Sequence, residues 1–276
     1  MTTRIAAVAD TFGRDLEACF ARIALLIDWA RADGARLLVL PEAAIGGYLS
    51  DLGGHAPLPP AFERDGREVA RLAALAGDMV VCAGLCERDG QGRYNAAVCV
   101  SGQGVLGWHR KVHQPLNESA SYRPGDRFAA FDTPVGRLGM LICYDKAFPE
   151  AARALALDGA EIVACLSAWP SSRSAPAANL ADDRWARRFD LFDRARALEN
   201  QVVWASANQS GAFGSLRFVG QAKVVGPGGD VLAATGNDAG VAVADVDVPG
   251  VLATARRSMF HLLDRRPAAY RMEVPA

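Results

Sequence analysis

Apolar and polar positions alternate in blocks along the chain, and most blocks end at a turn signal. Short continuous apolar runs, typical of strands buried on both faces, occur at residues 4–8, 36–40, 79–85, 94–100, 138–143 and 162–166. Weaker strand patterns follow at residues 105–111, 129–132, 201–207, 221–225, 231–234 and 241–246. Apolar residues three or four apart predict helices at residues 15–32, 60–76, 149–157 and 182–200. Strands interleaved with helices in this way predict a mixed α/β protein whose helices cover β layers.

Three of the predicted strands end at a residue with reactive chemistry. Cys143 closes an apolar run just before a turn into a helix, where backbone N–H groups and the helix dipole can stabilise a thiolate. Glu42 follows the run at residues 37–40, and Lys111 closes the run that begins at residue 105. Taken singly, these residues also fit a packing cysteine, a loop carboxylate and a surface cation. Taken together, they supply a nucleophile, a base and an oxyanion stabiliser.

Composition narrows the class of protein. The chain has 276 residues, of which 51% are hydrophobic and 22% charged, as is typical of a soluble enzyme, and its net charge is -1. This charge gives no reason to expect nucleic acid or a membrane surface as a partner. No apolar stretch approaches the ~20 residues of a membrane span, and the N-terminus lacks a signal-peptide pattern, so a cytoplasmic location is expected.

Cysteine and histidine spacing gives no sign of a disulfide framework or a metal site. Six cysteines in a cytosolic chain of this size are expected to be free, five of them structural. The four histidines show no ligand spacing; they are His55, His109, His113 and His261. We therefore expect neither a metal nor a disulfide in the site.

Several short motifs resemble those of one enzyme superfamily. Three segments are similar, in order and spacing, to the signature regions of the nitrilase superfamily of carbon–nitrogen hydrolases: Leu40-Pro41-Glu42, Arg110-Lys111-Val112-His113, and Cys143-Tyr144-Asp145 with Phe148-Pro149-Glu150. Further matches are the Pro-Gly-Asp loop at residues 122–126, the helix end at residues 194–201 and the C-terminal segment at residues 264–270. The resemblance therefore covers nearly the whole chain.

This resemblance implies a fold and a mechanism. It implies a four-layer αββα sandwich in a single domain over residues 1–276, which pairs into a homodimer or a larger homo-oligomer. It implies a catalytic triad of Glu42, Lys111 and Cys143 that acts on a small molecule through a thioester, with no metal or organic cofactor. The backbone N–H of Tyr144 would assist Lys111 at the oxyanion. Glu118, eight residues before Asp126, matches a second glutamate that orients the lysine or the substrate amine.

The substrate is less defined by the sequence. Tyr144 and Asp145 follow the nucleophile where nitrile-cleaving relatives commonly have Trp and Glu, which favours an amide over a nitrile or an N-carbamoyl compound. Lys146 is the only cation in that turn and could bind a carboxylate, although it also fits a solvated surface lysine. Trp169 and Tyr48 are candidates for the pocket wall; the alternatives are core packing for Trp169 and a plain loop aromatic for Tyr48.

Two other functions fit parts of the pattern. A papain-type hydrolase needs a histidine well after the cysteine, and only His261 qualifies, in an apolar segment at residues 259–263 that indicates packing. A hydrolase-like scaffold that only binds a metabolite needs no intact set of catalytic residues, so the presence of all three argues against it.

Overall fold

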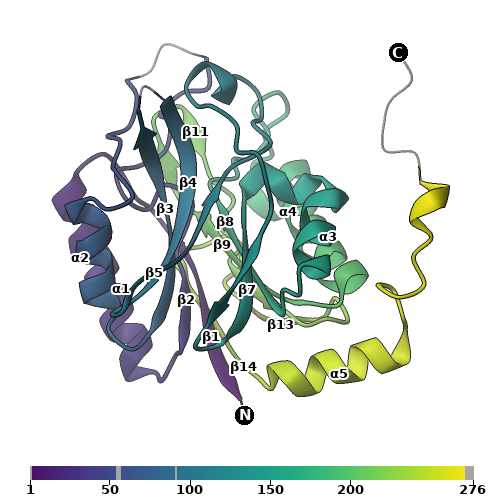
Figure 1. The fold of residues 1–276 in the computed structure, drawn as a ribbon. Coiled ribbons are helices and arrows are strands. Elements are labelled where there is room, and N and C mark those ends of the chain that lie inside the picture. Colours follow the sequence, from purple (N-terminus) through teal and green to yellow (C-terminus); the bar gives the residue numbers. More distant parts are fainter. Residues whose placement is uncertain (1, 54–56, 91, 271–276) are drawn as a thin grey trace.

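Two layers of strands form the centre of the computed structural model, which describes residues 2–53, 57–90 and 92–270 (Figure 1). One layer has the order β14 (Gly240–Val246), β1 (Thr3–Asp10), β2 (Leu37–Val39), β3 (Val80–Asp89), β4 (Gly92–Ser101) and β5 (Gly104–Arg110). The other has the order β13 (Val231–Ala234), β12 (Lys223–Val225), β9 (Val203–Gln209), β8 (Ile162–Ser167), β7 (Gly136–Ile142) and β6 (Ala130–Thr133). The layers meet where the ends of β1 and β9 pair in parallel, Ala9 with Asn208 and Asp10 with Gln209.

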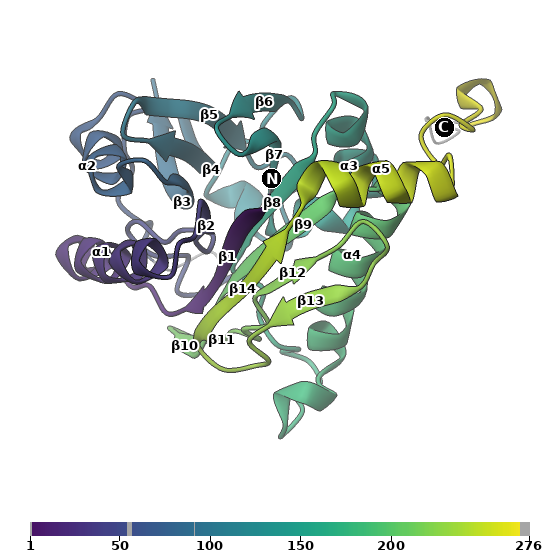
Figure 2. The same ribbon diagram turned by 90° about the horizontal axis from the view of Figure 1, so that it is seen from below.

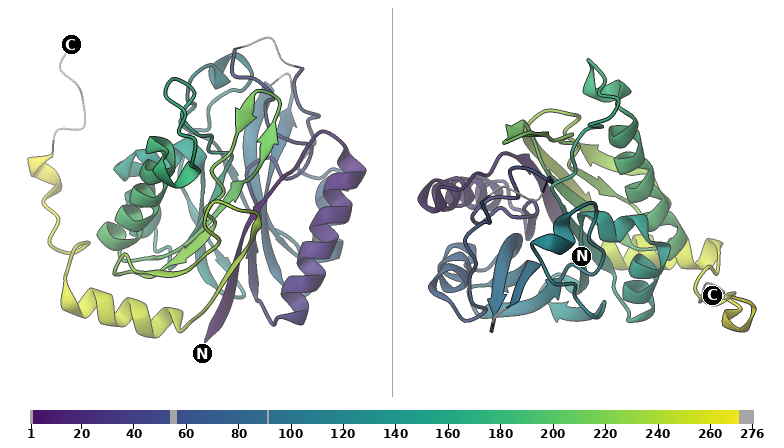
Figure 3. Two further views of the ribbon diagram at one scale, coloured as in Figure 1. Left: turned by 180° about the vertical axis from the view of Figure 1, so that it is seen from behind. Right: turned by 90° about the horizontal axis from the view of Figure 1, so that it is seen from above.

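Helices cover the outer face of each layer. Figures 1 and 2 show α1 (Leu16–Ala32) and α2 (Arg67–Ala76) on one side, and α3 (Pro149–Leu157) and α4 (Arg184–Asn200) on the other. The views from behind and from above in Figure 3 show the same arrangement. Asp15 and Asp183 cap the first turns of α1 and α4, because their carboxylates accept backbone N–H groups that have no helical partner. The predicted four-layer αββα sandwich is confirmed.

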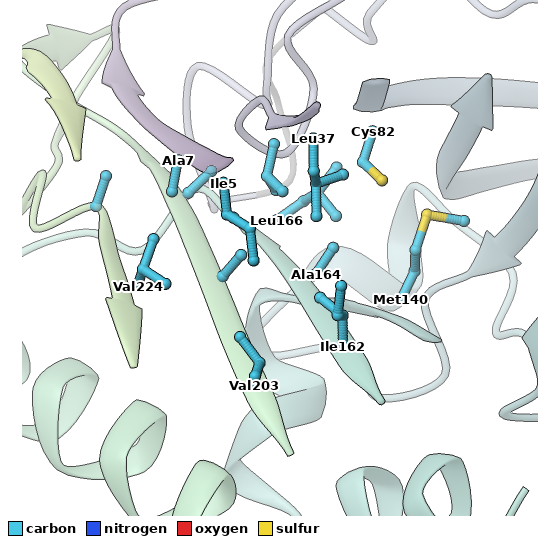
Figure 4. Close-up of a cluster of buried hydrophobic side chains, with 14 of the residues drawn as sticks. Ile5, Ala7, Leu37, Cys82, Met140, Ile162, Ala164, Leu166, Val203 and Val224 are labelled. Atoms are coloured by element: carbon cyan, nitrogen blue, oxygen red, sulfur yellow. The ribbon is translucent and has the colours of Figure 1, made fainter. Parts of the chain in front are cut away.

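Alternation along the strands divides the core into an inner and an outer part. Ile5, Ala7 and Leu37 of the first layer and Met140, Ile162 and Ala164 of the second layer point into the space between the two layers (Figure 4). The residues between them, such as Ala6 and Val8, pack against α1 and α2. In the second layer Val163 and Cys165 likewise pack outward with residues of α3 and α4. Because both faces of each central strand are buried, the strands are mostly apolar, and the polar exceptions in β9 lie toward its end, at Ser206, Asn208 and Gln209.

The segment predicted as one helix at residues 60–76 is helical only in its second half. α2 begins at Arg67, and the residues before it run along β3. The N–H of Phe62 donates to the carbonyl of Cys86 (2.8 Å), and the N–H of Arg88 donates to the carbonyl of Phe62 (2.7 Å). Pairing with the sheet therefore replaces the first helical turns.

The C-terminal part differs from the expected pattern. α5 (Val248–Ser258) was not predicted. The expected packing of the segment at residues 259–263 is only partly confirmed: Leu262 packs against the outer core of the second layer, whereas Met259, Phe260 and Leu263 are 58%, 51% and 79% exposed. Figure 1 shows this segment leading away from the sandwich. The remaining elements are short: β10 (Ala212–Phe213), β11 (Leu216–Arg217), η1 (Glu118–Ala120), η2 (Cys143–Ala147), η3 (Leu180–Asp182) and η4 (Pro267–Ala269).

Some expectations fall partly outside the described residues. The predicted hairpin between β3 and β4 is present, with Asp89 opposite Gly92, but Gln91 of its turn is outside. His55 and residues 271–276 of the expected domain are also outside. Among the described helices, none combines the length and apolar character that a membrane span requires.

Candidate active site

The ends of three strands bring the predicted catalytic residues into one buried region. Glu42 follows β2 across Pro41, Lys111 follows β5 directly, and Cys143 begins η2 at the end of β7. Two of these strands belong to one layer and β7 belongs to the other, so the site lies between the layers. The exposed fractions are 0% for Glu42, 0% for Lys111 and 3% for Cys143. Burial therefore excludes the alternatives of a solvated carboxylate for Glu42 and a surface cation for Lys111.

The carboxylate of Glu42 is held on both oxygens. Oε1 accepts hydrogen bonds from Lys111 Nζ (2.8 Å) and Asn95 Nδ2 (2.6 Å), and Oε2 accepts one from the backbone N–H of Ala168 (2.6 Å). The backbone carbonyl of Glu42 accepts a further bond from Gln209 Nε2 (2.9 Å). Asn95 was not singled out in the sequence, although a polar residue at the head of the apolar run at residues 96–100 could have identified it. These bonds hold the carboxylate of Glu42 in one orientation, and that orientation determines which neighbouring group can exchange a proton with it.

Gly84 allows the loop that carries Glu42 to lie directly on β3. A Cβ atom at Gly84 would come within 2.3 Å of the Ala43 nitrogen and 2.6 Å of the Glu42 Cα. Because both contacts are with backbone, neither could relax by side-chain rotation. A larger residue at this position would displace the carboxylate of Glu42.

Glu118 joins the same network from the start of η1. Its Oε1 accepts bonds from Lys111 Nζ (2.9 Å) and from the hydroxyl of Tyr48, whereas its buried Oε2 has no partner among the described residues. Burial raises the pKa of Glu118 to about 7, although the nearby ammonium of Lys111 opposes this shift. Burial by itself would lower the pKa of Lys111, but the carboxylates of Glu118 and Glu42 raise it well above its usual value. Lys111 is therefore a stable cation at neutral pH.

The thiol of Cys143 is neutral at rest. Burial, followed by the negative charge of Glu42, raises its pKa well above the usual value, and the cation of Lys111 only partly offsets this. The expectation that the turn itself stabilises a thiolate is thus wrong, because loss of hydration outweighs the favourable surroundings. The proton must leave the sulfur during the reaction, to a base.

Asp145 holds the turn that carries the nucleophile. Its Oδ2 accepts the backbone N–H of Ile142 (3.1 Å) and pairs with His109 Nε2 (3.1 Å), while its Oδ1 bonds the backbone N–H (2.9 Å) and Nδ1 (3.0 Å) of His113. Burial would raise the pKa of Asp145, but the two histidines lower it to about 2. The turn is therefore anchored by a carboxylate that stays ionised. Cys143 has a positive φ of 50° within this anchored turn.

Lys146 lies elsewhere than expected. Its Nζ is fully buried, bonds Asp193 Oδ1 of α4 at 2.8 Å and sits 3.0 Å from the ring centroid of Phe189. Lys146 is not among the residues that line the cavity beside Cys143, so the structure does not bring this predicted substrate-binding residue to the substrate side. The alternative of a solvated surface lysine is also wrong. Its charge instead ties the nucleophile turn to α4.

A cavity of about 550 Å³ opens beside Cys143. Tyr48, Tyr144 and Trp169 line it, and Tyr48 and Trp169 are the two residues that the sequence suggested for the pocket wall. Sequence analysis missed most of the remaining wall, which includes Leu52, Pro115, Leu116, Trp185, Arg188 and Phe192. These residues come from loops and from α4, where the spacing of apolar residues predicted a helix without indicating which face meets the substrate.

His261 is separated from this cavity. It lines a different groove, which it shares with residues of α3 such as Arg153 and Leu157, and Cys143 is not part of that groove. His261 therefore does not form a papain-type pair with Cys143. Within the described ranges, no group of three or more histidine, cysteine, aspartate or glutamate residues is arranged to hold a metal ion.

A four-layer αββα sandwich with a cysteine, a glutamate and a lysine buried together at its strand ends defines a protein of the nitrilase superfamily. The chain belongs to the carbon–nitrogen hydrolase family, whose model matches residues 4–256. It is 34% identical over 227 residues to a nitrilase of Pyrococcus abyssi, covering 81% of each chain. It is 36% identical over 235 residues to an (R)-stereoselective amidase of a Pseudomonas species, covering 83% of this chain and 79% of the relative.

A solved structure of similar fold adds chemical detail. An amidase variant from Nesterenkonia sp. AN1 aligns with a TM-score of 0.78 and 26% identity over 96% of this chain and 94% of that one. That structure shows covalent addition of the acetamide moiety of fluoroacetamide at its active-site cysteine. Together with the family match, these relatives establish that the present chain is a hydrolase acting on carbon–nitrogen bonds.

Proposed function

We propose that the protein hydrolyses an amide to an acid and ammonia through a thioester on Cys143. The observation that carries this proposal is the hydrogen-bonded pair of Glu42 and Lys111, fully buried beside a neutral thiol that lines a cavity. A carboxylate next to a neutral thiol is the arrangement that a general base requires. An ammonium in the same buried place can stabilise an oxyanion more strongly than it could in water.

The first half of the reaction forms the thioester. The sulfur of Cys143 attacks the amide carbon while its proton passes to Glu42. Lys111 and the backbone N–H of Tyr144 stabilise the negative oxygen, an effect worth roughly 3–4 kcal/mol for each donor. Glu42 then returns the proton to the nitrogen, the carbon–nitrogen bond breaks, and ammonia leaves.

The second half regenerates the thiol. Water gives one proton to Glu42 and its oxygen to the acyl carbon, with Lys111 again stabilising the negative oxygen. The carbon–sulfur bond breaks, the acid leaves, and Glu42 returns the proton to the sulfur. The net change is one amide and one water consumed, and one acid and one ammonia formed, with no cofactor taking part.

Glu118 is proposed as a positioning and substrate-orienting group. Its Oε1 is occupied by Lys111 and Tyr48, but its buried Oε2 is unpartnered in the described residues. A free acceptor at this place suits the N–H of a substrate amide, whose binding would remove the cost of an unsatisfied buried oxygen. This oxygen also favours an amide over a nitrile, because a nitrile nitrogen carries no hydrogen to donate.

The test is a release assay for ammonia over matched amides, nitriles and N-carbamoyl compounds. We expect the amides to react fastest, and added hydroxylamine to divert product from acid to hydroxamate, because both nucleophiles compete for one acyl-enzyme. Glu42→Gln and Lys111→Ala should each lower the rate by orders of magnitude. Faster cleavage of the matched nitrile would replace the amidase assignment with a nitrilase one and leave the catalytic residues unchanged.

We further propose that two copies of the chain associate through the exposed apolar side chains next to α3 and after α5. Leu157 and Tyr270 are 51% and 48% exposed and border a groove of about 810 Å³, and Phe260 and Leu263 lie nearby in sequence to Tyr270. Clustered exposed apolar residues of this kind are typical of an interface.

The six cysteines are all free in the described residues, which fits action in a reducing cytoplasm.

A further inference from the structure

We infer that the acyl group accepted beside Cys143 is bulky, apolar and uncharged, such as an arylalkyl group, a specificity that rests on the proposed amide hydrolysis. The cavity of about 550 Å³ is far larger than the two-carbon acyl group of acetamide needs. The chemistry of its walls indicates what fills the remaining space.

One wall is a fixed aromatic surface. The ring of Trp169 contacts those of Trp185 and Phe192, with centroids 6.1 and 6.0 Å apart, and also contacts the buried ring of Phe189. The indole N–H of Trp169 donates to the backbone carbonyl of Trp185 (3.0 Å), and its backbone N–H donates to Asn208 Oδ1 (2.7 Å). Because these polar groups are already engaged, the part of Trp169 left for the cavity is apolar carbon.

Aliphatic side chains at the cavity remain partly in water. Leu116 and Leu191 both line it and are 56% and 63% exposed. A ligand with an apolar tail would remove part of this surface from water, which is the main source of affinity in such a site. A short polar acyl group would leave these leucines exposed.

Few polar groups line the cavity, and one of them, the buried indole N–H of Trp185, has no partner among the described residues. The hydroxyl of Tyr48 donates to Glu118, and the thiol of Cys143 is reserved for the reaction. Among the described residues lining the cavity, Arg188 carries the only charge; it is exposed and forms no ion pair within the described chain. A solvated guanidinium gains little from a charged ligand. A carboxylate on the acyl chain would lose hydration against the aromatic wall, and no buried cation among the described lining residues would compensate for that loss.

Three amides with the same reacting group test this inference: 3-phenylpropanamide, acetamide and succinamic acid. We expect kcat/KM to be at least about 10²-fold higher for 3-phenylpropanamide than for the other two, since each added methylene in a fitting pocket contributes about 10-fold or more. Phe192→Ala should lower the ratio of kcat/KM for 3-phenylpropanamide to kcat/KM for either of the other two amides. Leu198→Ala, a change to a half-exposed leucine of the same helix that does not line the cavity, is the matched control and should leave the ratio unchanged.

Binding to the Cys143→Ala variant separates this inference from the proposed reaction. Calorimetry should show the same order of affinity for the three amides without turnover. If 3-phenylpropanamide binds best but the native protein hydrolyses no amide, the specificity stands and the amidase assignment fails. If acetamide or succinamic acid equals or exceeds 3-phenylpropanamide in binding and in kcat/KM, the inferred specificity is overturned, and a preference for succinamic acid would assign a binding role to Arg188.

Discussion

Cys143 combines a strained backbone with a protonated thiol, and both are maintained by neighbours. Its φ of 50° belongs to the left-handed region, which costs a residue with a Cβ atom roughly 1–2 kcal/mol. Asp145 holds this conformation through hydrogen bonds from the backbone N–H of Ile142, just before the turn, and of His113, in the segment after β5. The strain is stored where the strand ends and aims the sulfur between the two layers.

Replacement of Cys143 by alanine should abolish turnover and leave the fold unchanged. The sulfur is the proposed nucleophile, and alanine accepts the same backbone with a small loss of volume. Ammonia release should fall to the background rate, while the urea midpoint of unfolding stays close to that of the native protein. Cys19→Ala, a buried cysteine of α1, is the control and should keep full activity. Activity retained by Cys143→Ala would eliminate the thioester mechanism.

Glu118 should make the free energy of unfolding depend on pH. The pKa of Glu118 is about 7 in the folded protein against an ordinary 4.5, so between these values the folded state holds a proton that the unfolded state has released. Its contribution to stability is complete below pH 4.5 and is lost as pH rises to about 7, by up to about 1.4 kcal/mol per pH unit.

Glu118→Gln should remove the pH dependence of stability that the Glu118 carboxyl group causes. Urea unfolding measured at several pH values should give a flatter profile for the variant than for the native protein between pH 4.5 and 7. Glu63→Gln, at an exposed surface carboxylate, is the matched control and should keep the native profile. Identical profiles for Glu118→Gln and the native protein would mean that Glu118 is ionised in this range.

At the scale of elements, a buried ion pair attaches the nucleophile turn to α4. Lys146 of η2 bonds Asp193 of α4, and Arg196 of the same helix donates to the backbone carbonyl of Lys146 (2.8 Å). Trp204 of β9 donates its indole N–H to the same oxygen of Asp193 (2.9 Å). The position of the turn thus depends on a helix that also supplies part of the cavity wall.

Removal of the Asp193 carboxylate should strongly lower the free energy of unfolding. Asp193→Ala leaves the ammonium of Lys146 buried without its carboxylate, which typically costs 3–5 kcal/mol of unfolding free energy. Urea unfolding measures this loss, and kcat should fall with it because the turn is no longer held. Arg187→Ala breaks an exposed pair with Asp182 at the same helix and should cost less than about 1 kcal/mol. Equal losses in the two variants would contradict the anchoring role.

The sequence predicted elements better than their boundaries or contacts. Continuous apolar runs identified the central strands, and three short motifs identified where Glu42, Lys111 and Cys143 would meet. The helix at residues 60–76 was overextended, because periodicity does not reveal that Phe62 finds a partner in β3. The burial of Lys146 was missed for the same reason: its partner Asp193 is 47 residues away, and no local pattern records such a distant pairing.

At the scale of the whole molecule, the C-terminal segment should govern association. Phe260 and Leu263 are 51% and 79% exposed in the single chain. Leaving two large apolar side chains in water within so short a segment is unfavourable, and a partner that covers them would remove this apolar surface from water. Phe260→Asp combined with Leu263→Asp should convert a dimer into a monomer in light scattering. Val231→Asp combined with Leu232→Asp changes two exposed apolar residues of β13 and is the matched control, expected to stay dimeric. A native protein that is monomeric at micromolar concentration would contradict the proposed interface.

The pairing of β1 determines when, during synthesis, the two layers of strands can assemble. β1 precedes the other described strands in the chain, yet Thr3 pairs with Val246, and the junction of the two layers needs Asn208 and Gln209. For most of synthesis, then, one edge of β1 has no partner, and the inner face of the first layer has nothing to pack on. A nascent chain halted before β9 would carry Glu42, Lys111 and Cys143 but no assembled centre. Activity should therefore appear only late in translation, and chaperones that shield open strand edges should matter more for this protein than its modest size suggests.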